Sequence, residues 1–90
     1  MSVVRQLRIV NEKGLHARAS ARFVELVEAH DACAVVAKDG DSVSGDSIMG
    51  LLMLGASKGS TIELRTSGPE AEQLANALGA LVADYFGEAM

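Results

Sequence analysis

The chain has few aromatic residues and a single cysteine. Phe, Trp and Tyr make up 3% of its 90 residues, so we expect an aliphatic core built from Val, Leu, Ile, Ala and Met. One cysteine excludes an internal disulfide and agrees with a reducing compartment, so we expect a cytoplasmic protein. Cys33 lies in the apolar run 32–36, and we expect it to be buried in a strand.

Long apolar runs and an excess of positive charge are also absent. No apolar stretch approaches the roughly 20 residues that span a bilayer, and residues 1–10 lack the apolar core of a signal peptide. We therefore expect neither membrane insertion nor export. The net charge of −4 argues against nucleic-acid binding, because such domains are usually basic. A hydrophobic fraction of 49% is typical of a folded protein, and we expect residues 1–90 to form one domain.

Hydrophobic periodicity predicts seven elements. Alternating or β-branched stretches predict strands over 3–10, 32–38, 42–45 and 61–66, with Ile62 and Leu64 facing inward. Helical spacing predicts helices over 16–29, from residue 46 or 47 to 54, and after residue 67. The order β-α-β-β-α-β-α predicts an α+β fold, an open-faced two-layer sandwich. In it a four-stranded antiparallel sheet is covered on one face by three helices, and its other face meets water.

Turn and cap residues support these boundaries. Asp39-Gly40 predicts a tight hairpin, because both of its central positions need a positive φ. Asp46 or Ser47 is expected to cap the second helix, and Gly55 to end it in a left-handed conformation. The stretch 67–70 has the spacing of a capping box for the last helix. The expected apolar stripe of that helix is Leu74, Leu78, Leu81, Val82 and Tyr85.

The segment 14–20 carries the most informative chemistry. It places His16 where a loop gives way to a helix, with Arg18 two residues later. A helix N-terminus offers unpaired N–H groups and a positive dipole end, which bind anions and favour a neutral, nucleophilic imidazole. A phosphoryl group on His16 would meet Arg18 and the following backbone N–H groups. These phosphate-binding donors are expected on Ala17, Arg18, Ala19 and Ser20.

Other chemistries lack the residues that they need. The second histidine, His30, is expected about 20 Å away at the far end of the same helix, where a positive charge is favourable. We therefore expect no metal site and no cofactor. No motif sets a serine beside His16 for a catalytic triad, and there is no glycine-rich loop for a nucleotide.

Two further features suggest a docking surface. Basic residues gather before residue 23, around His16, and would suit an acidic partner; they are Arg5, Arg8, Lys13, Arg18 and Arg22. The stretch 46–55 is too apolar for a short helix to bury on every side, so part of it should be exposed as an adaptable docking patch. The candidates are Ile48, Met49, Leu52 and Met53. Ser47, at the start of this helix, is also a favourable place for a phosphate.

Gly14-Leu15-His16-Ala17-Arg18, together with Ser47-Ile48-Met49-Gly50-Leu51, resembles the HPr family. These are the histidine-containing phosphocarriers of the bacterial phosphoenolpyruvate phosphotransferase system. The resemblance covers essentially the whole chain, and the helix around 51–54 is similar to the nitrogen-regulatory branch. It implies a monomeric carrier rather than an independent enzyme. Enzyme I would phosphorylate His16 through Nδ1, and an enzyme IIA-type acceptor would remove the phosphoryl group.

The resemblance also assigns roles to individual residues. Arg18 would stabilise the phosphate, and Ser47 matches the regulatory serine that an HPr kinase/phosphorylase modifies in some bacteria. The surface that contacts partners would consist of Ala21, Arg22, Ile48, Met49 and Leu52. One position departs from the family motif: Ala19 follows the arginine where proline is usual. Alanine restores an N–H group and loses some of the rigidity that proline supplies.

Two other functions remain open on the sequence. A small α+β regulatory or binding module could use the same helix N-terminus as an anion site without any phosphorelay. An acylphosphatase-like enzyme is a weaker alternative, because no catalytic asparagine accompanies the anion site in a recognisable motif.

Overall fold

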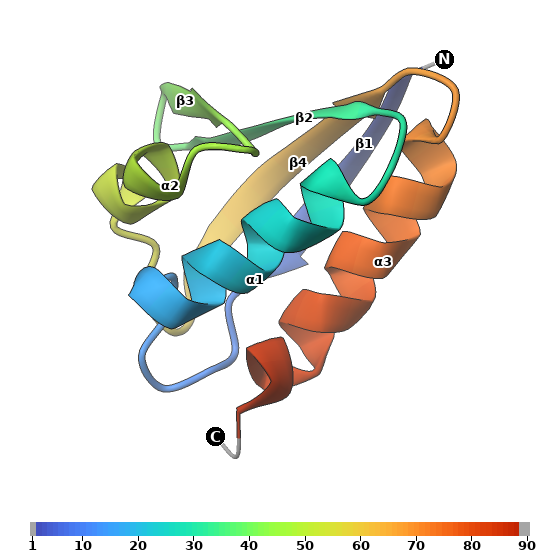
Figure 1. Cartoon of the computed structure of the whole chain (residues 1–90). Coiled ribbons are helices and arrows are strands. Elements are labelled where there is room, and N and C mark those ends of the chain that lie inside the picture. The colour runs from blue at the N-terminus through green and yellow to red at the C-terminus, as the bar shows by residue number, and fades with distance from the viewer. Residues whose placement is uncertain (1, 89–90) are drawn as a thin grey trace.

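The computed structural model describes residues 2–88 and has the predicted order of elements. The strands are β1 (Ser2–Arg8), β2 (Cys33–Lys38), β3 (Asp41–Ser44) and β4 (Thr61–Ser67). The helices are α1 (Ala17–Glu28), α2 (Ile48–Leu54) and α3 (Ala71–Ala83), followed by the short 3₁₀ turn η1 (Tyr85–Gly87). All strand pairs are antiparallel, in the order β1-β4-β2-β3. The predicted open-faced sandwich is confirmed (Figure 1).

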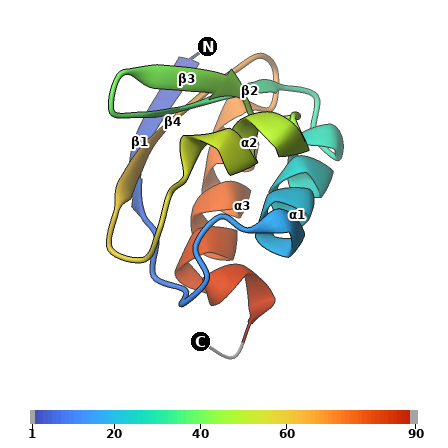
Figure 2. The same cartoon turned by 90° about the vertical axis from the view of Figure 1, so that its left-hand side faces the viewer.

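The three helices lie on one face of the sheet, and α2 packs beside α1 near the β2–β3 hairpin (Figure 2). Strand alternation places Ile62 and Leu64 under the helices, fully buried, as predicted. The opposite face carries exposed apolar side chains, among them Val4 and Val35. No helix within residues 2–88 is long and apolar enough to cross a membrane.

The prediction that Cys33 is buried is wrong. Cys33 is the first residue of β2 and is exposed. The buried positions of this strand are Ala34 and Val36, which point toward the helices. Successive side chains of a strand point to opposite faces, so Cys33 and Val35 share the open face. An apolar run cannot reveal which of its alternate residues a one-sided sheet will leave in water.

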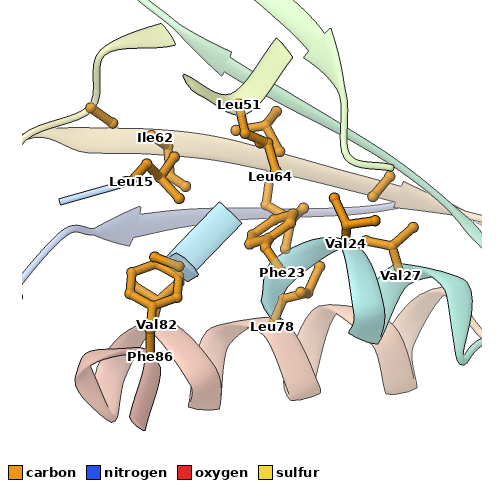
Figure 3. Packing of buried hydrophobic residues seen from close by; sticks show 14 of the residues in the cluster. Leu15, Phe23, Val24, Val27, Leu51, Ile62, Leu64, Leu78, Val82 and Phe86 are labelled. Atoms are coloured by element: carbon orange, nitrogen blue, oxygen red, sulfur yellow. The ribbon is translucent and has the colours of Figure 1, made fainter. Parts of the chain in front are cut away.

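The core is aliphatic except for two phenylalanines. Phe23 of α1 and Phe86 of η1 are both fully buried in the main cluster (Figure 3). Methionine, which we expected in the core, lies outside it in the described chain: Met49 and Met53 are exposed. Both phenylalanines thus bury a large apolar surface in the core.

Most turn and cap predictions are confirmed. Asp39 and Gly40 both have positive φ, at 52° and 86°. The Ser47 side chain accepts a hydrogen bond from the Gly50 N–H at 3.0 Å, and Gly55 ends α2 in the left-handed region with φ 62°.

The predicted capping box at 67–70 is wrong. Helix α3 begins at Ala71, its N-cap Glu70 makes no side-chain capping bond, and the Glu70 carboxylate instead accepts the N–H of Asp31. The acidic residue that would have closed the box therefore ties the helix start to the loop before β2.

The end of α3 also differs from the prediction. Leu74, Leu78 and Val82 are buried as expected, and Leu81 is partly buried. The helix stops at Ala83, however, and the chain then takes positive φ at Tyr85 and Phe86. This reversal exposes Tyr85, which we expected in the stripe, and turns Phe86 into the core instead.

Candidate functional site

His16 is the N-cap of α1, as the sequence predicts, and two local features place it there. Gly14 has a φ of 63°, and a side chain on it would collide with the Ala56 carbonyl, so this close crossing of two loops requires glycine. The buried Leu15 donates its N–H to that carbonyl at 2.9 Å. The His16 side chain remains partly accessible, with 26% of its surface exposed.

The first turn of α1 presents three free backbone donors. Within residues 2–88, the N–H groups of Ala17, Arg18 and Ala19 have no hydrogen-bond partner. Such groups at the positive end of a helix attract anions. The Ser20 N–H does not belong to this set, because it donates to the His16 carbonyl at 2.9 Å. Three of the four expected backbone donors are therefore free within the described residues.

Arg18 is exposed, and its guanidinium makes no hydrogen bond to any described residue. Its positive charge is thus available to an anion at the helix start. The side chain of Ala19 is fully buried, although the backbone N–H of this residue is one of the three free donors. A proline at this position would remove that donor.

A glutamate that the sequence analysis missed contacts His16. Glu88, 72 positions away, places Oε2 2.7 Å from His16 Nε2. Asn11, whose side chain is buried, donates to Glu88 Oε1 at 2.8 Å and to the Gly14 carbonyl at 2.9 Å. No motif in the sequence marks Glu88, because the contact exists only after the segment 84–88 folds back onto the loop before α1.

The surroundings of Glu88 favour its ionised form. Burial by itself would raise the pKa of this carboxyl group, but hydrogen bonds from Asn11 and His16 and electrostatic attraction to His16 and Lys13 outweigh it. The net effect lowers the pKa of Glu88 below its ordinary value of 4.5. The site therefore holds a carboxylate against one nitrogen of the imidazole.

The basic cluster is smaller than the sequence suggested. Lys13 acts electrostatically on Glu88, and Arg22 donates to the Phe86 carbonyl at 2.7 Å, two residues before Glu88. Arg5, in contrast, donates to Asn76 on α3 and belongs to the contact between the sheet and that helix. Arg8 is exposed at the end of β1.

Helix α2 forms an exposed apolar patch, which we call the α2 patch: Ile48, Met49, Leu52 and Met53. Met49 and Met53 expose 67% and 80% of their surface, Ile48 is also exposed, and Leu52 is partly buried. Only Leu51 of this helix is buried. Because α2 packs against α1, the patch lies on the helix next to the one that His16 precedes as N-cap (Figure 2). Ala21 of α1 is partly buried, and Arg22 is exposed.

The second histidine, His30, contacts the backbone of α1. Its Nδ1 lies 2.7 Å from the Leu26 carbonyl, near the end of α1. Across residues 2–88, no group of three His, Cys, Asp or Glu side chains could hold a metal ion.

Comparisons with known proteins point to one family. Residues 3–84 match the family model described as PTS HPr component phosphorylation site. The chain is 43% identical to phosphocarrier protein HPr of Cupriavidus necator over 84 residues, which cover 93% of this chain and 94% of the relative. It is 35% identical to phosphocarrier protein NPr of Escherichia coli over 89 residues, covering 98% and 99%.

The fold comparison agrees. The crystal structure of HPr-C-His from Thermoanaerobacter tengcongensis superposes with a TM-score of 0.93 at 35% identity. The superposition covers 98% of this chain and 99% of that one.

Proposed function

Because this chain belongs to the HPr family of phosphotransferase-system phosphocarriers, we propose that His16 accepts a phosphoryl group from phosphorylated enzyme I and passes it to an enzyme IIA-type acceptor. The observation that carries this proposal is the position of His16 at the N-cap of α1, beside three free N–H groups. A nucleophile and an anion site thus share one helix start.

The groups that contact the phosphoryl group in this transfer belong to the first turn of α1. The lone pair of His16 Nδ1 forms a bond to phosphorus, while the bond between phosphorus and the donor breaks and its electron pair returns to the donor. Charge on the phosphoryl oxygens is met by the N–H groups of residues 17–19 and by the Arg18 guanidinium. The same steps in reverse hand the phosphoryl group to the acceptor.

A carrier must also release what it binds. The donors at residues 17–19 belong to the first turn of a helix, and Arg18 is exposed. This arrangement stabilises the phosphoryl group while leaving it accessible to a second protein. In our proposal, donor and acceptor therefore use the same face in succession.

The partners' docking surface would consist of the α2 patch together with Arg22 and Ala21. Exposed methionine and isoleucine side chains adapt to different apolar partners. Arg18 and Arg22 add positive charge for an acidic rim. Ser47 caps α2 directly beside Ile48, so phosphorylation of Ser47 by an HPr kinase/phosphorylase would place charge at the edge of this surface.

The test is transfer of labelled phosphoryl groups from phosphoenolpyruvate through enzyme I. The wild-type protein should take up acid-labile, alkali-stable label, which is characteristic of phosphohistidine. His16→Ala should take up none while remaining folded, because the His16 side chain makes no capping hydrogen bond to α1 and is partly exposed. His30→Ala is the matched control and should be labelled like the wild type.

Two outcomes would contradict the proposal. Label on folded His16→Ala would move the acceptor to another residue. Absence of label on the wild-type protein would favour the alternative, a regulatory module that binds an anion at α1 without a phosphorelay.

A further inference from the structure

The contact between His16 and Glu88 joins the start of α1 to the segment that follows α3. Both oxygens of Glu88 are engaged: Oε2 lies 2.7 Å from His16 Nε2, and Oε1 accepts from Asn11 at 2.8 Å. Only 13% of the Glu88 side chain is exposed. This is a fixed carboxylate with two specific partners, unlike the exposed ion pair between Glu12 and Lys58.

The backbone before Glu88 determines where the Glu88 side chain lies. Tyr85 and Phe86 hold positive φ values of 59° and 54°, a conformation that is costly for residues with side chains. Burial of Phe86 in the core and the bond from Arg22 to its carbonyl hold this turn in place. The following Gly87 also has positive φ, and a side chain on it would collide with Arg22. A strained turn is thus fixed immediately before the carboxylate.

Asn11 supplies the second constraint. Its side chain is fully buried, and its amide nitrogen donates to both Glu88 and the Gly14 carbonyl. The amide oxygen is buried without a partner among the described residues. Asn11 therefore gives up one hydrogen bond in an orientation that directs its NH₂ group toward Glu88.

These contacts determine which nitrogen of His16 is free. An ionised carboxylate only accepts hydrogen bonds, so the neutral imidazole must carry its proton on Nε2 and its lone pair on Nδ1. Nδ1 makes no hydrogen bond to the described residues. We propose that Glu88, oriented by Asn11, is a positioning residue that fixes the Nε2–H tautomer of His16 and so makes Nδ1 the nucleophile. This inference rests on the proposed phosphorelay.

The carboxylate assists both directions of transfer. When Nδ1 of the Nε2–H tautomer bonds to phosphorus, the ring gains a positive charge, and Glu88 stabilises that charge at Nε2. When the phosphoryl group leaves, the bonding pair returns to Nδ1 and the proton stays on Nε2, so the departing ring is neutral. No proton has to be added or removed between the two transfers.

The test combines a tautomer measurement with transfer kinetics. The ¹⁵N NMR shifts of the His16 ring are recorded with the imidazole in its neutral form for the wild type, Glu88→Ala, Glu88→Gln and the control Glu12→Gln. The rates of phosphoryl transfer from enzyme I and back to it are measured for the same proteins. Glutamine matches the shape of Glu88 but has one oxygen for two donors, so it cannot serve both Asn11 and His16.

We expect the Nε2–H tautomer to dominate in the wild type and in Glu12→Gln. Both Glu88 variants should give mixed tautomers and transfer about tenfold slower in each direction, the worth of one such hydrogen bond. A Glu88→Gln protein with the wild-type tautomer and rates would show that Glu88 only fills space, and would overturn the inference. Slow transfer with an unchanged tautomer would overturn it as well. Failure of the wild type to be labelled would refute the phosphorelay, while the NMR shifts would still decide the role of Glu88.

Discussion

At the scale of single residues, backbone and side chain contribute separately in the first turn of α1. The Ala19 side chain is buried in the core, whereas its N–H is free to bind an anion. The Arg18 side chain is exposed, and its N–H adds a second donor. In our proposal, the backbone of this turn therefore binds the phosphoryl group, while the Ala19 side chain contributes to packing.

Ala19→Pro tests this separation. Proline is tolerated in the first turn of a helix, where its missing N–H breaks no internal bond, and it restricts the unfolded chain. We expect the melting temperature to change by no more than about 5 °C. Phosphoryl transfer should slow by less than about tenfold, because the N–H groups of Ala17 and Arg18 remain.

Thermal unfolding and initial transfer rates check the Ala19→Pro prediction, with Ala29→Pro as a contrast. The Ala29 N–H donates to the Glu25 and Leu26 carbonyls at the end of α1, so proline there should lower the melting temperature more. Unfolding of Ala19→Pro itself would show that the turn cannot accommodate the residue that is usual in the family.

At the scale of elements, α2 combines a hydrogen-bonded N-cap with an exposed apolar face. Ser47 accepts from the Gly50 N–H, and Leu51 anchors the helix to the core. The α2 patch faces outward, so the helix holds apolar side chains in water at a defined place. Ser47 and Leu51 thus stabilise α2, whereas the proposed docking surface consists of other residues of this helix.

Ser47→Asp should therefore preserve the fold and weaken docking. Aspartate caps a helix as well as serine does, so we expect the melting temperature to stay within about 5 °C of the wild type. The added charge beside Ile48 and Met49 makes desolvation of the patch costly and opposes an acidic partner. We expect transfer from enzyme I to fall at least several-fold, with partial recovery in high salt because screening weakens the charge repulsion.

Initial transfer rates at low and high salt check the Ser47 prediction. Ser67→Asp is the matched control, because Ser67 is exposed at the far end of β4 from α2 (Figure 1). Equal rates for Ser47→Asp and the wild type at low salt would leave Ser47 with no role beyond capping α2.

At the scale of the whole molecule, the sequence predicts what local patterns determine. The helix start at His16, the hairpin at Asp39-Gly40 and the exposed patch on α2 follow from spacing and turn chemistry. The contact of Glu88 with His16 does not follow from such patterns, because it depends on a turn at Tyr85 and Phe86. Both residues have positive φ values, although neither is a glycine. That turn is held by tertiary packing of Phe86, which a local pattern cannot reveal.

The same long-range contact should make stability depend on pH. Because folding lowers the pKa of Glu88 below 4.5, the stabilisation is fully present above that value. It is lost as the pH falls through the lower pKa of the folded state. In urea unfolding between about pH 6 and pH 3, we expect the wild type to lose more stability than Glu88→Gln. Glu12→Gln should follow the wild type, and parallel curves for the wild type and Glu88→Gln would contradict the prediction.

The open face of the sheet lies on the side of the molecule opposite the helices. Cys33, the one cysteine of the chain, lies there, while α1 and His16 lie on the helical side. A dye or a surface tether joined to this thiol would leave the helical face unobstructed. Two copies linked through their Cys33 sulfurs would stand back to back with both histidines outward. The bare sheet is therefore a natural point of attachment for watching single molecules exchange phosphoryl groups.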